Sequence, residues 1–139
     1  MRRAVVRRRE DYEHEIEMRQ HRLIVDEPVE KDGTDKGPMP AELLAAALAS
    51  CTAITMEMYA GRKEWGLGTV EVAVDFTEST TDDPPIFDVQ ITLGGELSEE
   101  TQDRLLTIAS KCPVHKALTS QEVVIHDSLE LIEDAEDED

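Results

Sequence analysis

Apolar and polar side chains alternate along residues 12–18, a segment in which glutamates separate Tyr12, His14, Ile16 and Met18. A period of two is typical of a β-strand that turns one face to the core and the other, here the glutamate face, to water. The apolar triplet at 23–25 follows a short polar break, so we expect an antiparallel hairpin. Residues 70–76 and 87–93 alternate in the same way on either side of an Asp-Asp-Pro-Pro turn and predict a second pair of strands.

Residues 40–63 instead carry a helical pattern rich in alanine and leucine. Pro40 suits the first turn of a helix, and neither glycine nor proline follows before Gly61. No charged side chain lies between Glu42 and Glu57, so the predicted helix is apolar on almost all sides. Such a helix is normally enclosed on most sides, and in so short a chain we expect a second subunit to provide part of the enclosure.

The remaining segments predict smaller elements. Ser98, followed by two glutamates, indicates the N-cap of a second helix that ends near Lys111. Pro113 suits the first position of a short third helix, and the apolar triplet at 123–125 predicts a last strand. Together these elements predict an α+β fold in a single domain over residues 1–139, with a basic segment at 1–10 and a solvated acidic tail at 133–139.

The charge of the chain restricts its partners. Its 32 acidic and 14 basic side chains give a formal net charge of −18, which argues against DNA or RNA as a main partner. We expect the arginines of residues 2–9 to balance this acidic surface, an anion site being the alternative. Such self-repulsion is best tolerated in a salt-rich cytoplasm. Because neither a secretory signal nor an apolar run of about 18 residues is visible, we expect a cytoplasmic protein without a membrane partner.

Two cysteines are the candidates for chemistry. Cys51 lies in the middle of the predicted long helix among small residues that leave space around a thiol, although a free cysteine often serves only as a small apolar side chain. Cys112 precedes Pro113 and should therefore lie near a helix N-cap, where the helix dipole, free N–H groups and Lys111 would lower the pKa of its thiol. The alternative for Cys112 is a plain capping residue in a turn.

Other polar residues could join the cysteines. A zinc site would need Cys112 and His115 together with Cys51 or one of His14, His21 and His126. Four ligands at ordinary zinc spacing are not visible, so we expect neither a metal nor another cofactor.

Two charged residues near the long helix are further candidates. Arg22, beside the loop that leads to the helix, could stabilise a thiolate, or it could be a surface cation. Glu42 precedes Cys51 by nine residues, so the two side chains project from opposite sides of a helix and cannot exchange a proton directly. Glu42 could instead complement the helix N-terminus.

Both cysteines lie in motifs that resemble those of a known family. The segment from Gly37 to Thr55, GPMPAELLAAALASCTAIT, resembles the first-cysteine helix of the OsmC/Ohr family, and residues 111–115, KCPVH, resemble its second-cysteine motif. The resemblance extends from about Tyr12 to Ile125. The two motifs in this order are specific, whereas either alone would be weak.

This resemblance implies an α+β fold, an intertwined homodimer and thiol-dependent reduction of organic hydroperoxides. Cys51 would be the peroxidatic thiolate that is oxidised to a sulfenic acid, Cys112 would resolve it to a disulfide, and a dithiol reductant would reset the pair. Arg22 and Lys31 are the nearest options for the family's assisting arginine, and Glu42 comes one place later than the family's glutamate. Hydroperoxide resistance members carry a glutamate directly after the proline that opens the helix, where this chain has Ala41.

The chain is therefore closer to the general OsmC-like branch. A slow redox sensor or small-molecule-binding protein is the alternative function. A pocket lined by Leu44, Leu48, Met56 and Met58 would favour a bulky apolar peroxide.

Overall fold

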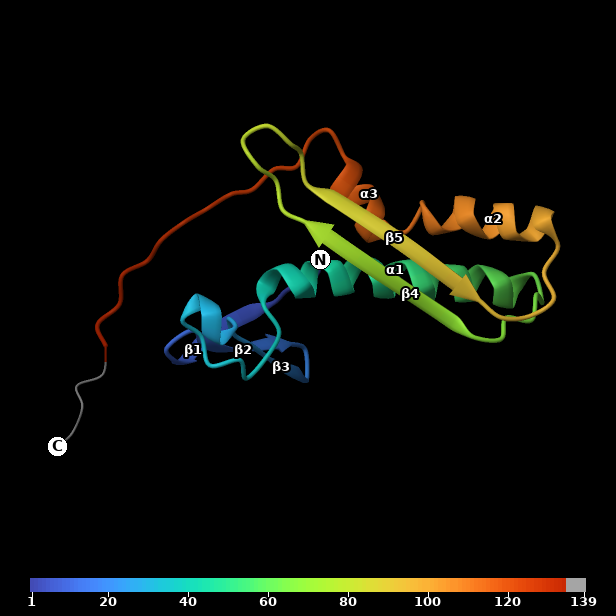
Figure 1. The fold of residues 1–139 in the computed structure, drawn as a ribbon. Coiled ribbons are helices and arrows are strands. Elements are labelled where there is room, and N and C mark those ends of the chain that lie inside the picture. The colour runs from blue at the N-terminus through green and yellow to red at the C-terminus, as the bar shows by residue number, and fades with distance from the viewer. Residues whose placement is uncertain (135–139) are drawn as a thin grey trace.

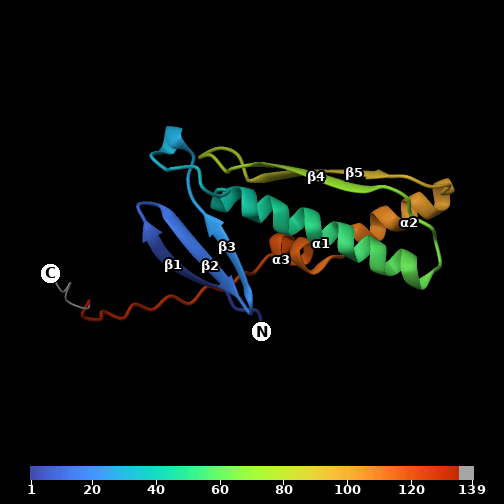
Figure 2. The same ribbon diagram turned by 90° about the horizontal axis from the view of Figure 1, so that it is seen from below.

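The chain folds into two antiparallel sheets and a long central helix, which confirms the predicted α+β class (Figure 1). The computed structural model describes residues 1–134. A three-stranded sheet contains β1 (Val5–Glu10), β2 (Glu13–Met18) and β3 (His21–Val25), and a two-stranded sheet contains β4 (Val70–Thr77) and β5 (Ile86–Leu93). The helices are the short 3-10 helix η1 (Val29–Lys31), α1 (Pro40–Arg62), α2 (Glu99–Ala109) and α3 (Pro113–Thr119). The β4–β5 pair runs along α1, and β1–β3 lies at the N-terminal end of that helix (Figure 2).

The first sheet contains the predicted hairpin, in which Ile16 of β2 pairs with Leu23 of β3. The strand β1 was not predicted, because its three consecutive arginines hide the strand pattern. Two of these arginines balance acidic neighbours, as expected: Arg7 pairs with Glu17 at 3.3 Å and Arg9 with Glu13 at 3.0 Å. The prediction that the glutamates of β2 all face water is wrong for Glu13, which is buried.

A hydrogen-bonded loop connects this sheet to α1. The buried carboxylate of Asp26 accepts hydrogen bonds from the Thr34 hydroxyl at 2.6 Å and from the backbone N–H groups of Glu27 at 2.7 Å and Lys36 at 3.2 Å. The Asp26 N–H in turn donates to the carbonyl of Pro38 at 3.0 Å. Gly33 packs so closely on the Glu27 backbone that any side chain would collide with it. This loop therefore determines where α1 begins.

One side of α1 carries the core. Leu48, Thr52, Met56 and Ala60 recur every fourth residue and are buried, and Met56 and Ala60 pack against Leu105 and Ala109 of α2. The other side of α1 is open in the single chain, with Leu44, Ile54 and Met58 exposed. The predicted enclosure of the helix on most sides is thus incomplete within one chain.

By length and composition α1 could also cross a bilayer, because an 18-residue window has a mean hydropathy of 1.4. The expectation that no such segment exists was therefore too broad. Length and composition are weak evidence for a membrane span, since long core helices of folded proteins have the same composition. Here α1 packs on β4, α2 and α3.

The second sheet follows the predicted alternation. Val70 pairs with Leu93 at one end of the β4–β5 ladder, and Phe76 pairs with Phe87 near the other, their rings stacked with centroids 4.5 Å apart. The N-cap prediction for α2 is also confirmed, since the Ser98 hydroxyl accepts a hydrogen bond from the Thr101 N–H at 3.1 Å.

The predicted last strand at 123–125 does not form. This segment has no regular secondary structure, and Val123, Val124 and Ile125 are all exposed. Beyond α3 the chain extends away from the helices and sheets (Figure 1), so the triplet has no neighbouring strand with which to form a ladder. Most of the predicted acidic tail, residues 135–139, lies outside the described residues.

Candidate redox site

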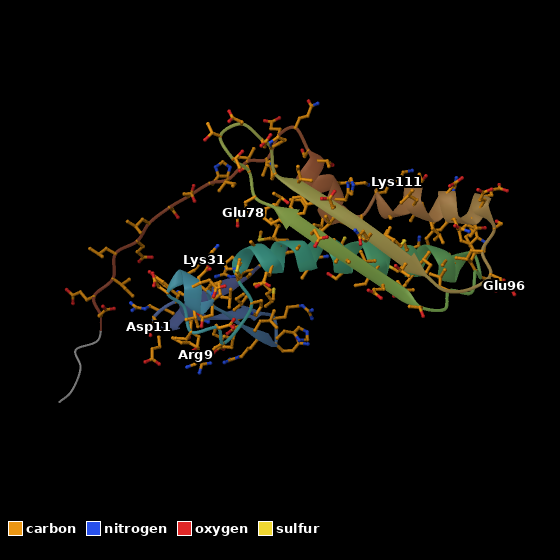
Figure 3. The ribbon with its side chains drawn as sticks, viewed as in Figure 1. Arg9, Asp11, Lys31, Glu78, Glu96 and Lys111 are labelled. Atoms are coloured by element: carbon orange, nitrogen blue, oxygen red, sulfur yellow. The ribbon has the colours of Figure 1, made fainter. Side chains whose placement is uncertain are left out.

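Cys51 and Cys112, which are far apart in the sequence, meet where α3 packs on α1. Cys51 lies in the middle of α1 and is partly exposed, whereas Cys112 is completely buried. The hydroxyl of Thr52, the residue after Cys51, lies 4.0 Å from the Cys112 sulfur. Both cysteines are free thiols. The α2–α3 junction that presents Cys112 is marked by Lys111 in Figure 3.

Cys112 is the N-cap of α3, as predicted. Its extended backbone leads into Pro113, and its sulfur accepts a hydrogen bond from the backbone N–H of His115 at 3.3 Å. Its carbonyl accepts a further hydrogen bond from the Lys116 N–H at 3.0 Å. Proline at the first helical position and an extended cap residue both arise from the local sequence, which is why this position was predictable.

The environment of Cys51 favours the neutral thiol. Burial raises the pKa of Cys51 above its ordinary value, because a charged sulfur is poorly solvated there. The backbone N–H of Val114 opposes this effect by hydrogen bonding to the sulfur, the neighbouring Cys112 raises the pKa further, and the Thr55 hydroxyl lowers it. The net direction is upward. Burial, the largest single effect, and the neighbouring Cys112 together outweigh the two hydrogen-bond donors.

The two charged candidates lie elsewhere in the single chain. Arg22 is on β3, where it pairs with Glu15 of β2 at 2.9 Å and lies 3.8 Å from Glu17. The Glu42 carboxylate accepts a hydrogen bond from the Met39 N–H at 2.9 Å and so closes the first turn of α1. No hydrogen bond joins either residue to Cys51 within residues 1–134. A catalytic role for Arg22 or Glu42 stays a prediction.

The structure also adds residues that the sequence analysis did not single out. Thr55 follows Cys51 by four residues on the same face of α1, a spacing that could have indicated the contact. The contribution of Val114 could not be predicted, because it comes from a backbone N–H on another helix.

The zinc alternative gains no support in the described part of the chain. No group of three or more histidine, cysteine, aspartate or glutamate side chains is placed there so that it could hold a metal ion. His14 uses its Nδ1 in a hydrogen bond with the carbonyl of Tyr12 at 2.8 Å.

The prediction that Leu44, Leu48, Met56 and Met58 line one pocket is only partly correct. Leu48 lines a cavity of about 270 Å³ beside α3, together with Phe87, Val89 and His115. Met56 borders a different cavity, between β5 and α2, and Leu44 and Met58 are exposed in the single chain. The four residues share one helix but not one face.

Fold and site together define an α+β protein with a long central helix and a pair of free cysteines, one on that helix and one at the cap of a short helix packed on it. The chain belongs to the family of OsmC-like proteins, whose model matches residues 33–126. This confirms the family resemblance read from the two cysteine motifs.

Solved structures agree with this assignment. A Psychrobacter arcticus protein described as an osmotic stress induced and detoxification response protein is 26% identical, with a TM-score of 0.73 over 81% of this chain and 85% of that one. An OsmC-like protein from Mycoplasma pneumoniae is 20% identical, with a TM-score of 0.75 over 87% and 89% of the two chains. The organic hydroperoxide resistance protein OhrB of Bacillus subtilis is 19% identical, with a TM-score of 0.60 over 87% and 92%. No curated protein sequence matches the chain significantly.

Proposed function

We propose that the protein is a thiol-dependent peroxidase that reduces organic hydroperoxides through Cys51 and Cys112. The observation that carries this proposal is the meeting of the two free cysteines at the α1–α3 contact, where Cys112 is close enough to raise the pKa of Cys51. Membership of the OsmC-like family supports it. Solved relatives of the same fold include proteins described as organic hydroperoxide resistance proteins.

The reaction proceeds in three balanced steps. The Cys51 thiolate attacks the terminal oxygen of the hydroperoxide, the O–O bond breaks, and the alkoxide leaves as an alcohol after taking up a proton, which yields a Cys51 sulfenic acid. The Cys112 sulfur then attacks the Cys51 sulfur, a disulfide forms and water leaves. A dithiol reductant finally transfers two electrons and two protons to the disulfide and restores both thiols.

The accessibility of the thiols supports this assignment of roles. Cys51 is partly exposed, so a peroxide can reach it, whereas Cys112 has no exposed surface. A buried thiol behind a reactive one is suited to resolving a sulfenic acid. Because both thiols must stay reduced between turnovers, the proposal also places the protein in the reducing cytoplasm.

The proposal includes a homodimer. The exposed apolar side of α1, with Leu44, Ile54 and Met58, is one surface that a second subunit would cover. The exposed apolar residues at 123–125 are another, and a strand supplied by a second copy would complete the ladder that this segment lacks. A cation from that copy would also lower the pKa of Cys51.

The test mixes reduced protein with cumene hydroperoxide or hydrogen peroxide and follows peroxide consumption in the presence of a dithiol. We expect repeated turnover, faster with cumene hydroperoxide because the neighbouring cavity has apolar walls. Cys51→Ser should abolish turnover. Cys112→Ser should allow one oxidation but no disulfide. Turnover that survives Cys51→Ser would refute the proposal.

A slow redox sensor is the second candidate function. The raised pKa of Cys51 favours it, because a neutral thiol reacts slowly with peroxide. The sensor would undergo a single stoichiometric oxidation to the Cys51–Cys112 disulfide without turnover when dithiol is present. The same assay therefore separates the two functions.

A further inference from the structure

One hydroxyl interrupts the buried apolar side of α1. The buried residues of this helix are Leu48, Thr52, Met56 and Ala60, and Thr52, of which 2% is exposed, is the polar one among them. Burying a hydroxyl costs free energy unless the hydroxyl finds a hydrogen-bond partner. A valine has nearly the same shape and would fill this position without that cost. The hydroxyl of Thr52 therefore requires an explanation beyond packing.

The partner of the Thr52 hydroxyl differs from that of other hydroxyls on the helices. Ser50, Thr107 and Thr119 each donate to the carbonyl four residues earlier in their own helix, at 2.8, 3.0 and 2.8 Å. Within residues 1–134 the Thr52 hydroxyl instead has one hydrogen-bonding contact, with the Cys112 sulfur at 4.0 Å. A contact of this length to sulfur is a weak hydrogen bond. The hydroxyl thus joins α1 to the residue that caps α3.

The Cys112 sulfur is held by two elements. It has no exposed surface, it accepts a hydrogen bond from the His115 N–H of α3 at 3.3 Å, and the Thr52 hydroxyl contacts it from α1. Thr52 directly follows Cys51 in the chain, so this contact keeps Cys112 next to the thiol with which it would form a disulfide. A hydroxyl suits a sulfur that changes its protonation state, because it accepts from an S–H group and donates to a thiolate.

We infer that Thr52 is a positioning residue for the resolving thiol, whose hydroxyl holds the Cys112 sulfur against α1 beside Cys51. This inference deepens the proposed function and rests on it for the resolving role of Cys112. In the step concerned, the Cys112 sulfur loses its proton and attacks the Cys51 sulfur, the S–O bond of the sulfenic acid breaks, and the hydroxide takes up a proton and leaves as water. Because the Thr52 hydroxyl contacts Cys112, its loss should slow this step and leave the first oxidation of Cys51 unchanged.

The test forms the same disulfide without a peroxide. Reduced protein reacts with one equivalent of dithiodipyridine, which converts the partly exposed Cys51 to a mixed disulfide and releases one thiopyridone. The Cys112 sulfur then attacks the Cys51 sulfur, the mixed disulfide breaks, and a second thiopyridone leaves. The absorbance of thiopyridone gives the rates of both releases. In Cys112→Ser the second release should be absent.

Variants of Thr52 separate the hydroxyl from the shape of the side chain. In Thr52→Val the second release should slow about threefold, the low end for one net hydrogen bond, while the first release and the Tm are maintained. Thr52→Ser keeps the hydroxyl and should restore most of the rate. If the valine variant does not fold, Thr52→Ala is compared with Thr52→Ser, because these two differ only in the hydroxyl.

Thr107→Val is the matched control, since it removes a hydroxyl on α2 that bonds only the backbone, and both releases should keep their wild-type rates. Equal rates of the second release in Thr52→Val and the wild type would overturn the inference. Equal slowing in the valine and serine variants would do the same, because the shape and not the hydroxyl would then be responsible. Absence of the second release from the wild type would also overturn it.

The outcome is separable from that of the proposed function. A protein that consumes no hydroperoxide but shows the slower second release in Thr52→Val refutes the peroxidase and leaves the role of Thr52 standing. Where turnover occurs, the Cys51 sulfenic acid should persist longer in Thr52→Val, and dimedone should trap about threefold more of it than in the wild type. Turnover with equal trapping in the two proteins would refute the role of Thr52 and leave the peroxidase intact.

Discussion

The pKa of a buried ionisable group is shifted in opposite directions in two regions of the molecule, the loop after β3 and the α1–α3 junction. In the loop that follows β3, four hydrogen bonds to Asp26, led by that of the Thr34 hydroxyl, lower the pKa of its carboxyl to about 2 despite burial. At the α1–α3 junction, burial raises the pKa of Cys51 in spite of two donors. Burial alone therefore does not decide the protonation state of a group.

The distribution of ion pairs separates the same two regions. Every ion pair within residues 1–134 joins residues of β1–β3 and the loop leading to α1, including those of Glu13 with Arg9 at 3.0 Å and with Lys36 at 3.4 Å. Charged side chains such as Arg9, Asp11 and Lys31 crowd this end of the chain (Figure 3). Four cations, Arg7, Arg9, Arg22 and Lys36, thus pair with glutamates of this sheet, and no ion pair within residues 1–134 lies at the α1–α3 junction.

Removing the Asp26 carboxylate charge should have the largest effect. Asp26→Asn replaces one carboxylate oxygen with an NH2 group, which cannot accept from the Thr34 hydroxyl and the Lys36 N–H, or from the Glu27 N–H, so we expect the Tm to fall by roughly 5–10 °C. Glu30→Gln, at an exposed carboxylate in the same loop, is the control and should shift the Tm by much less. Thermal unfolding followed by circular dichroism measures both. Equal shifts in the two variants would show that the network around Asp26 is unimportant.

The same carboxylate should give the wild type a pH-dependent stability. The folded pKa of Asp26, about 2, lies below the ordinary value of 3.8, so the unfolded chain binds more protons between these values. The contribution of Asp26 is therefore fully present above the ordinary pKa and is lost as the pH falls through about 2. Urea midpoints measured across this range should fall more steeply for the wild type than for Asp26→Asn. Parallel curves would contradict the prediction.

Adding a cation to the α1–α3 junction should give Cys51 a charged partner, as the glutamates of the β1–β3 sheet already have. Ile54 is exposed one turn after Cys51, and Ile54→Arg brings a guanidinium close enough to lower the pKa of Cys51. Alkylation of Cys51 by iodoacetamide at neutral pH should then be about fourfold faster, since the larger thiolate fraction outweighs the lower nucleophilicity. Measurement in a Cys112→Ser background isolates the Cys51 signal. Ile54→Gln is the neutral control, and equal rates for the two would contradict the electrostatic explanation.

A smaller effect is expected from the donor that already assists Cys51. Thr55→Val keeps the shape of the side chain but removes the hydroxyl that lowers the pKa of Cys51. The alkylation rate should fall about twofold to threefold, with little change in fold. Thr107→Val, at a hydroxyl on α2 that bonds only the backbone, should leave the rate unchanged. An unaltered rate in Thr55→Val would mean that this hydroxyl does not reach the sulfur.

The smallest effect should come from Glu42. Glu42→Ala removes the hydrogen bond that closes the first turn of α1, and we expect a loss of about 0.5–1 kcal/mol in the free energy of unfolding. The alkylation rate of Cys51 should stay unchanged, because the two side chains project from opposite sides of the helix. A large loss of peroxide turnover with intact stability would instead give Glu42 the assisting role that the family resemblance implies.

Local patterns predicted most elements and one half of the site. Alternation predicted β2, β4 and β5, an apolar triplet predicted β3, the absence of breakers predicted α1, and Pro113 predicted that Cys112 would cap α3. Each of these features depends on residues within a few positions of one another, so the sequence contains the necessary information. The strand β1 was missed because its arginines find their partners only across the sheet.

What the sequence determined by itself was therefore the type and approximate extent of the elements and the presence of two cysteines in motifs of one family. Only the tertiary structure decided that Glu13 is buried and ion-paired, that Arg22 pairs with Glu15, that residues 123–125 lack a neighbouring strand, and that His115 lines a cavity together with Leu48. The physical reason is the distance along the sequence over which the relevant contacts act. Helix and strand patterns follow from neighbours along the chain, whereas burial, ion pairing and the pKa of Cys51 depend on groups that only folding brings together.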